Sequence, residues 1–287
     1  MRRTDAIGPP RRASGPRRLA VAAGVGALVL TVAGCSSEEL PRLGLPEAAT
    51  DKGAVVVNLW QGSWIAALIV GALVWGLIGY TVIFHRRRTS HEGTLPTQTR
   101  YNLPVEILYT VTPLLAVVVL FYFTWRDQNE LLELDPDPAV TVHVVGQQWS
   151  WTFNYVDQDV YTTGTPAQPP TLVLPQGQTT EFILTAHDVI HSMWIPAFLF
   201  KLDMLPGDPN TIQMTPQKVG TFAGRCAELC GTYHSRMLFT VEVVPQEEFE
   251  AAMAELEESG QTGQIRPELK DESFGSSSRV EPGEEGQ

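Results

Sequence analysis

The chain contains the segment Cys226-Ala-Glu-Leu-Cys230-Gly-Thr-Tyr-His234-Ser-Arg-Met237, which brings two thiols, an imidazole and a thioether close together in the sequence. Thiolate, imidazole and thioether ligands select copper over hard cations, and a set of His, Cys and Met is typical of electron-transfer copper in a β-sandwich. A second histidine is needed, and His191 is the candidate. A disulfide between the two cysteines is the competing interpretation, because the segment is predicted to lie outside the cytoplasm. The adjacent imidazole and thioether favour the metal.

Short apolar stretches surround this segment, and Pro, Gly, Asp and Thr separate them. This pattern indicates an antiparallel, all-β sandwich of Greek-key type over residues 127–245. The predicted strands are 139–145, 149–155, 171–174, 179–185, 211–214, 221–224 and 237–244. We expect His191 at a strand end and residues 226–237 in the loop between the last two strands, so that both meet at one pole of the sandwich.

Other sulfur and imidazole side chains in this domain are weaker candidates for ligands. His187 lies four residues before His191 and could compete with it, while His143 falls in the middle of a predicted strand. Three methionines are expected to fill the core, because Met commonly occupies gaps between other apolar side chains. They are Met193, Met204 and Met214.

Two long apolar segments precede the sandwich. Residues 60–84 contain no charged side chain, and residues 103–125 contain one acid, Glu106, and one proline, Pro113. Each can cross a hydrocarbon core of about 30 Å as a helix. The loop 85–102 is rich in arginine and contains a single acid, so the positive-inside rule places it in the cytoplasm. We therefore predict a transmembrane hairpin over 59–126 with both ends outside, and a buried soluble hairpin is disfavoured.

The N-terminal residues have the pattern of a lipoprotein signal peptide. Six arginines occur in residues 1–18, an apolar run follows, and Val32-Ala33-Gly34-Cys35 ends it. We predict a signal peptide over 1–34, lipidation of Cys35 and an external segment over 35–58. A buried, unmodified cysteine is the alternative. A lipid on Cys35 would lie on the outer face, which agrees with the predicted topology.

The external part of the chain is strongly acidic. From Asp127 onwards it has 25 Asp and Glu against 7 Lys and Arg, a formal charge of −18. Nucleic acid is therefore a poor partner, whereas a basic electron carrier would be attracted at low salt. The tail 246–287 is predicted to form a short helix through Glu257 and then to be disordered.

Glu106 admits two interpretations from its position alone. An acid within a span usually faces a partner or a polar pathway. It could equally lie at the level of the cytoplasmic headgroups, because it is close to the end of the span. The residues themselves leave both open.

Taken together, the two spans, the sandwich and the Cys-x3-Cys-x3-His-x2-Met string resemble subunit II of haem-copper cytochrome c oxidases, from the first span to about Val244. The resemblance implies a cupredoxin-like domain that holds a binuclear copper centre (CuA). In that centre Cys226 and Cys230 would bridge two coppers, and each copper would also bind one histidine. The remaining implied ligands are His191, His234, Met237 and the backbone carbonyl of Glu228. The Glu228 side chain would also bind magnesium at the boundary with subunit I.

Two further motifs carry the resemblance. The string Gly146-Gln147-Gln148-Trp149-Ser150-Trp151 is similar to the aromatic patch of the family, which implies that Trp149 receives the electron. The family usually has His where Gln147 stands, and an indole simply packed in the sandwich is the alternative for Trp149. The segment from Glu106 to Pro113 is similar to the start of the second span of the family, which implies that Glu106 lies at the entrance of a proton channel of subunit I.

The implied function is that of the electron-accepting subunit of a proton-translocating oxidoreductase. Electrons would come from cytochrome c or from a c-type haem subunit of a bc-type complex, and would pass to haem a in subunit I, where oxygen is reduced to water. Subunit III and membrane lipid are further implied partners. The lipoprotein signal and the acidic tail suggest the plasma membrane of a bacterium, an actinobacterium on composition.

Three other functions remain for comparison. A copper-free subunit of a quinol oxidase would share the architecture but would not need the ligands. A membrane-tethered copper chaperone would need only two or three ligands for an exchangeable ion. The electron-accepting subunit of a nitric oxide reductase shares the motif, and only the catalytic partner distinguishes it. No Cys-x-x-Cys-His motif occurs in the chain, so a donor haem must come from another protein.

Overall fold

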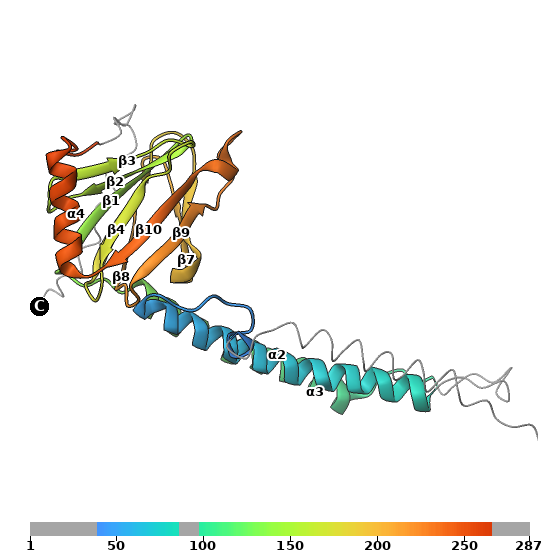
Figure 1. Ribbon diagram of the computed structural model, residues 1–287. Coiled ribbons are helices and arrows are strands. Elements are labelled where there is room, and N and C mark those ends of the chain that lie inside the picture. The colour runs from blue at the N-terminus through green and yellow to red at the C-terminus, as the bar shows by residue number, and fades with distance from the viewer. Residues whose placement is uncertain (1–38, 86–97, 266–287) are drawn as a thin grey trace, which may run out of the picture. The chain divides into compact units, whose positions relative to one another are not determined.

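The computed structural model describes residues 39–85 and 98–265 (Figure 1). The chain divides into two compact units, residues 1–44 and 45–287. The described part of the first unit contains one short 3-10 helix, η1 (Leu40–Arg42). The predicted signal peptide and Cys35 lie outside the described residues, as do most of the predicted cytoplasmic loop and the tail from residue 266 onwards. The prediction of disorder directly after Glu257 is wrong for residues 258–265, because Gln261, Gly263 and Ile265 hydrogen-bond to the sandwich. All the other helices and strands of the described residues belong to the second unit.

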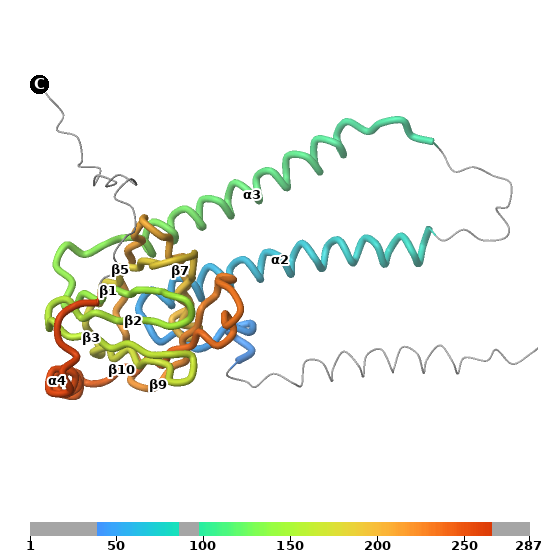
Figure 2. Tube along the Cα trace, turned by 90° about the horizontal axis from the view of Figure 1, so that it is seen from above, coloured from blue at the N-terminus to red at the C-terminus, as the bar shows by residue number. Residues whose placement is uncertain are grey.

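Two long helices begin this unit, α2 (Asp51–Phe84) and α3 (Leu103–Leu132), and they run in opposite directions (Figure 2). Thr50 starts α2, because its hydroxyl accepts a hydrogen bond from the backbone N–H of Gly53 at 3.2 Å. Both helices are long and apolar enough to cross a membrane. Each extends beyond the predicted span: α2 begins already at Asp51, and α3 continues to Leu132. Both extensions contain charged side chains, so a search for uncharged stretches does not include them.

Ten strands follow and form two five-stranded sheets. One sheet has the order β3-β2-β1-β5-β8 and the other β4-β10-β9-β6-β7. The bounds are β1 (Val140–Gln147), β2 (Ser150–Tyr155), β3 (Val160–Thr163), β4 (Thr171–Pro175), β5 (Thr180–Ala186), β6 (His191–Ile195), β7 (Phe200–Met204), β8 (Asn210–Met214), β9 (Gly220–Cys226) and β10 (Leu238–Val244).

The expectation of purely antiparallel sheets is wrong at two pairings. Strands β1 and β5 pair in parallel, as do β4 and β10. The chain leaves the first sheet to form β4 in the second and then returns to form β5, and such crossover connections are what parallel neighbours require. The prediction of a two-helix segment followed by an all-β sandwich is confirmed, with β3, β6 and β7 as strands that the pattern did not indicate.

The core lies between the two sheets. Trp151 and Phe153 of β2 pack on Phe239 of β10, with ring centroids 5.0 Å and 5.4 Å apart. The three methionines expected in the core are all buried there. A last helix, α4 (Gln246–Glu258), covers one open side with the buried side chains of Phe249 and Met253 (Figure 1). Its position confirms the predicted helix at the start of the tail.

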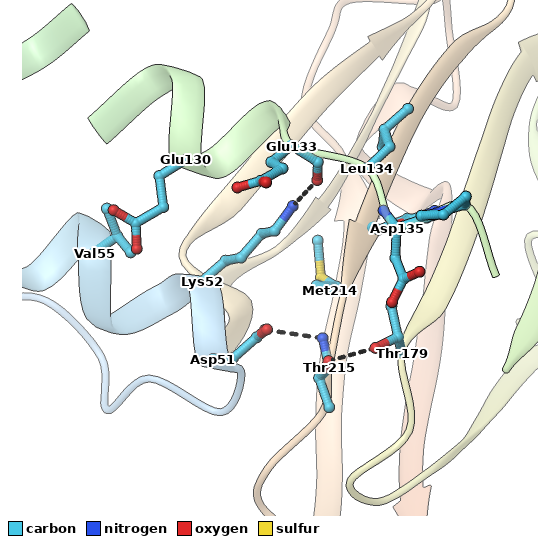
Figure 3. Close-up of a pocket in the computed structure, with 12 residues that line it drawn as sticks. Asp51, Lys52, Val55, Glu130, Glu133, Leu134, Asp135, Thr179, Met214 and Thr215 are labelled. Atoms are coloured by element: carbon cyan, nitrogen blue, oxygen red, sulfur yellow. Dashed lines mark hydrogen bonds between the residues drawn. The ribbon is translucent and has the colours of Figure 1, made fainter. Parts of the chain in front are cut away.

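Hydrogen bonds join the start of α2, the end of α3 and strand β8 around a pocket of about 510 Å³ (Figure 3). The Lys52 ammonium donates to the carbonyl oxygens of Leu131 and Glu133, each at 2.8 Å. These carbonyls end α3, so the lysine satisfies groups that a helix terminus leaves without partners. The Asp51 carboxylate accepts from the backbone N–H of Thr215 at 2.8 Å. The helices are thereby attached to the end of β8, the edge strand of the first sheet.

Candidate metal centre

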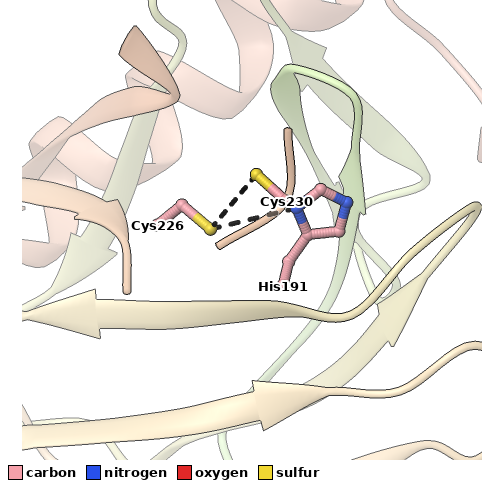
Figure 4. Close-up of side chains that lie close together, drawn as sticks. All are labelled: His191, Cys226 and Cys230. Atoms are coloured by element: carbon pink, nitrogen blue, oxygen red, sulfur yellow. Dashed lines mark hydrogen bonds between the residues drawn. The ribbon is translucent and has the colours of Figure 1, made fainter. Parts of the chain in front are cut away.

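Strand pairing brings the predicted ligands together at one pole of the sandwich. His191 is the first residue of β6 and Cys226 the last of β9, and these strands pair with Met193 opposite Cys226. The loop after β9 returns Cys230 to the same place, so that its Sγ lies 3.8 Å from Sγ of Cys226 (Figure 4). Both thiols are free. The competing disulfide is therefore absent from the described residues.

Each cysteine has its own histidine. Nδ1 of His191 lies 3.9 Å from Sγ of Cys226, and Nδ1 of His234 lies 3.5 Å from Sγ of Cys230. His234 belongs to the short 3-10 helix η4 (His234–Arg236), which aims its ring back at the loop. The ligand atoms of His191, Cys226 and Cys230 all lie within 4.8 Å of one another. Two thiol–imidazole pairs therefore lie side by side, with their sulfur atoms 3.8 Å apart.

Two more donors complete the group. Sδ of Met237 lies 3.8 Å from Sγ of Cys230, and the carbonyl oxygen of Glu228 lies 3.2 Å from Sγ of Cys226. His191 and Met237 are fully shielded from solvent, at 0% exposure each, and the cysteines nearly so. Thiolates, imidazoles and a thioether are soft ligands, and this set, in which only His234 is partly exposed among the side chains, fits a copper centre. All six predicted donors lie together.

The two thiols differ in acidity. Burial by itself would raise the pKa of Cys226, but hydrogen bonds with the His191 ring and the backbone of Ser192 outweigh it and lower the pKa to about 6. Burial and the neighbouring Cys226 thiolate raise the pKa of Cys230 to about 12. The metal-free pair therefore carries one negative charge near neutral pH. Binding of a cation by both thiolates displaces the remaining proton.

Asp188 fixes the orientation of the His191 ring. Its Oδ1 lies 2.8 Å from Nε2 of His191, and its Oδ2 accepts the backbone N–H of Gln148 at 2.7 Å. Burial would lower the pKa of His191, but the contacts with Cys226 and Asp188 raise it. A carboxylate on the outer nitrogen of a ligating imidazole sets the tautomer and raises the basicity of the ligand. Nδ1 thereby faces Sγ of Cys226.

The turn between β1 and β2 contacts the ligand loop from the other sheet. Trp149 is half-buried, and its indole ring packs edge-on against Tyr233 with centroids 5.0 Å apart. Its Nε1 donates to the carbonyl oxygen of Cys230 at 3.2 Å, and Nε2 of Gln148 donates to the same oxygen at 2.7 Å. The indole is thus both packed in the sandwich and in contact with a ligand segment.

The remaining predicted residues do not join the cluster. His187 is exposed, and His143 instead contacts the Thr185 hydroxyl at 2.8 Å through Nε2. The half-buried Glu228 side chain keeps its magnesium role as a prediction. Oε1 of Glu106 accepts the backbone N–H of Asn102 at 2.9 Å, which caps the start of α3 where the helix dipole favours a negative charge. A part in proton uptake stays a prediction for this residue.

Sequence reasoning missed Asp188, Gln148 and Gly231. Asp188 precedes His191 by three residues, so its closeness was a local signal that could have been used. Gln148 lies far from Cys230 in sequence, and only the pairing of distant strands brings them together. Gly231 has φ +123°, and a Cβ there would lie 3.1 Å from both Nε2 of Gln148 and Nε1 of Trp149.

The chain is similar in sequence to known proteins. A family model described as "Cytochrome C oxidase subunit II, periplasmic domain" matches residues 167–244. The chain is 46% identical to "Probable cytochrome c oxidase subunit 2" of Streptomyces avermitilis, over 87% of this chain and 90% of the relative. It is 36% identical to "Cytochrome c oxidase subunit 2" of Mycobacterium bovis, over 88% and 86%. The solved periplasmic domain of subunit II (CoxB) of Bradyrhizobium japonicum is 28% identical, covers 44% of this chain and 99% of that chain, and gives a TM-score of 0.41.

Proposed function

Because the chain belongs to the cytochrome c oxidase subunit II family, we propose that its copper centre is the binuclear CuA site through which electrons enter the oxidase. The chain is a subunit of a haem-copper terminal oxidase and a partner of subunit I. It is a membrane protein whose copper domain lies on the outer face. The binuclear form of the centre, its electron donor and the magnesium site are proposals.

One observation carries the binuclear assignment. The two sulfur atoms lie 3.8 Å apart, and each has a separate imidazole beside it. A single copper needs one thiolate and two imidazoles, whereas this set has two of each, plus a thioether and a carbonyl oxygen. Cys226 and Cys230 would bridge the metals, His191 and His234 would each bind one, and Met237 and the Glu228 carbonyl would complete the set. Bound copper would supply one-electron transfer between the donor and a haem of subunit I.

The protein contributes rigidity and exclusion of water. The ligands are carried by two paired strands and a short loop against a packed core, so the protein dictates their positions. Such fixed ligands keep rearrangement small when the charge of the site changes. We assign Trp149 as the point where the electron enters, because its indole N–H bonds to the Cys230 carbonyl while its ring stays half-exposed.

The proposal also includes the electron donor, the other subunits and the membrane in which the chain lies. The acidic surface suits a basic donor, a cytochrome c or a c-type haem subunit of a bc-type complex. We assign the half-buried Glu228 carboxylate to a magnesium ion shared with subunit I, and Glu106 to the entrance of its proton channel. The bacterial plasma membrane, lipid on Cys35 and contact with subunit III complete the proposed setting.

Electron paramagnetic resonance of the purified full chain, loaded with copper in detergent, tests the assignment. One unpaired electron shared by two copper nuclei gives a seven-line hyperfine pattern, with two coppers bound per chain. A four-line pattern with one copper would instead favour a copper chaperone. A chain that binds no copper would favour the copper-free quinol-oxidase type. A nitric oxide reductase would give the seven-line pattern too, and the catalytic subunit that copurifies distinguishes it.

A further inference from the structure

The carbonyl oxygen of Cys230 accepts two side-chain N–H groups from one turn. Nε2 of Gln148 donates at 2.7 Å and Nε1 of Trp149 at 3.2 Å. The turn connects β1 and β2 of one sheet, whereas Cys230 lies in the loop that follows β9 of the other sheet. Two neighbouring side chains therefore hold a single peptide group of the ligand loop, and the shorter bond is that of the glutamine.

Gln148 is also fixed through its backbone. Its N–H donates to Oδ2 of Asp188 at 2.7 Å, and Oδ1 of the same carboxylate contacts Nε2 of His191 at 2.8 Å. One residue is thus bonded at its backbone to the group that orients the first histidine, and at its side chain to the peptide of the second cysteine. Gln148 spans the two halves of the ligand set.

The ligand loop is shaped to receive these two donors. Residue 231 directly follows the carbonyl that they share, and it is a glycine with φ +123°. A Cβ at this position would lie 3.1 Å from each of the two donor nitrogens. The close approach of Gln148 and Trp149 to the loop therefore depends on the missing side chain.

We propose that Gln148 is a positioning residue for electron transfer: its amide holds the Cys230 peptide against the indole of Trp149 and so fixes the contact through which electrons pass. The inference rests on the proposed function. An N–H group on the carbonyl of a ligating cysteine also offsets the negative end of a dipole near the metal. Loss of that N–H favours the more positive, oxidised state, so the reduction potential should fall.

Two variants separate the hydrogen bond from packing. Gln148→Glu keeps the shape of the side chain but, when ionised, has no N–H to donate. Gln148→Leu removes the amide without adding a charge. The control is Gln147→Leu at the neighbouring glutamine, whose side chain is not part of this network. A change that both Gln148 variants show and the control does not is attributed to loss of the Gln148 amide N–H.

The first measurement needs no copper. In the copper-free full chain in detergent, hydrogen exchange of the Trp149 indole N–H is followed by nuclear magnetic resonance, with Trp149→Phe identifying its signal. A carbonyl no longer held by Gln148 is free to leave the indole, so exchange should rise about five-fold, as expected for the loss of one typical hydrogen bond. The control should exchange like the parent chain.

The second measurement uses the copper-loaded chain. Both Gln148 variants should keep the seven-line pattern, have a lower reduction potential and accept electrons more slowly. Unchanged indole exchange and unchanged potential in both variants would overturn the positioning role. If the parent itself lacks the seven-line pattern, the proposed function fails, but the copper-free exchange measurement still decides whether Gln148 positions Trp149.

Discussion

Asp188 and His191 share a contact of 2.8 Å between Oδ1 and Nε2, and this contact leaves Nδ1 of the same ring facing Sγ of Cys226 at 3.9 Å. An ionised carboxylate can only accept, so Nε2 keeps its proton, and it is Nδ1 that would give up a proton and offer its lone pair when a metal binds. The aspartate therefore chooses the tautomer of a buried ligand without reaching the metal itself.

Asp188→Ala should weaken copper binding about 10- to 100-fold, because the ring loses its orienting partner. The backbone N–H of Gln148 loses its acceptor as well. Competitive titration against a copper chelator measures the effect. Asp203→Ala is the matched control, since it removes the same charge from an exposed position on β7. If both variants lose copper affinity equally relative to the parent chain, the effect comes from the lost charge and not from the orientation of the ring.

Cys230→Ser should abolish the binuclear centre. The serine hydroxyl is a poor ligand for copper, and one thiolate cannot replace the bridge between two metals. We expect at most one copper per chain and loss of the seven-line pattern. A full two-copper spectrum in this variant would refute the ligand assignment. Circular dichroism of the metal-free variant checks that the sandwich still forms.

Met237→Leu should leave copper bound but make the two metal positions unequal. The side chain is completely buried and similar in volume to leucine, so the change should cost less than about 1.5 kcal/mol in stability. Its Sδ lies on the side of Cys230, 3.8 Å from Sγ, so only one half of the site loses a donor. Paramagnetic resonance should show a less even sharing of the electron. An unaltered hyperfine pattern would remove Met237 from the ligand set.

Trp149→Phe should slow electron acceptance while the copper spectrum stays intact. Phenylalanine preserves the aromatic packing on Tyr233 but cannot donate to the Cys230 carbonyl. Stopped-flow reduction with the native donor gives the rate. Trp194→Phe, on the second sheet and paired with Arg225, controls for the loss of an indole elsewhere. The role in electron transfer is contradicted if both variants react at the parental rate.

Gly231→Ala should destabilise the protein and also lower its affinity for copper. A side chain at positive φ costs about 1–3 kcal/mol, and here its Cβ also crowds the two donor nitrogens. Gly177→Ala separates the two effects, because Gly177 has φ +75° with nothing within 4 Å of a new Cβ. Thermal unfolding should be affected in both variants, and copper affinity only at residue 231.

The ligands could be predicted from sequence because their spacing is local chemistry. Five of the six donors lie in one short segment, and soft ligands in that order have few other uses. The network around them could not be predicted in the same way. Gln148 meets Cys230 only because β1, β2 and β9 occupy facing sheets, and no periodicity in the sequence encodes that approach.

The strands likewise divide into those that a local sequence pattern predicts and those that depend on pairing with distant strands. Alternating or β-branched stretches such as β5 and β10 were predicted nearly to the residue. Strand β6 was missed because His191 to Ile195 is short, lacks alternation and runs into Pro196. Its extended form comes from pairing with β7 and β9. Strand β3 has only four residues at a sheet edge, too few for a periodic signal.

The pairing of β6 with β9 also determines when the complete ligand set forms during folding. His191 and Cys226 are distant in sequence and become neighbours only when Met193 lies opposite Cys226. In an unfolded chain Cys226, Cys230 and His234 lie close together in sequence but His191 does not, so the full ligand set forms only when the sheets have closed. Copper can bind to the full ligand set only while Cys226 and Cys230 are still reduced. The thiols must be protected from oxidation until copper binds, in a compartment that favours disulfides.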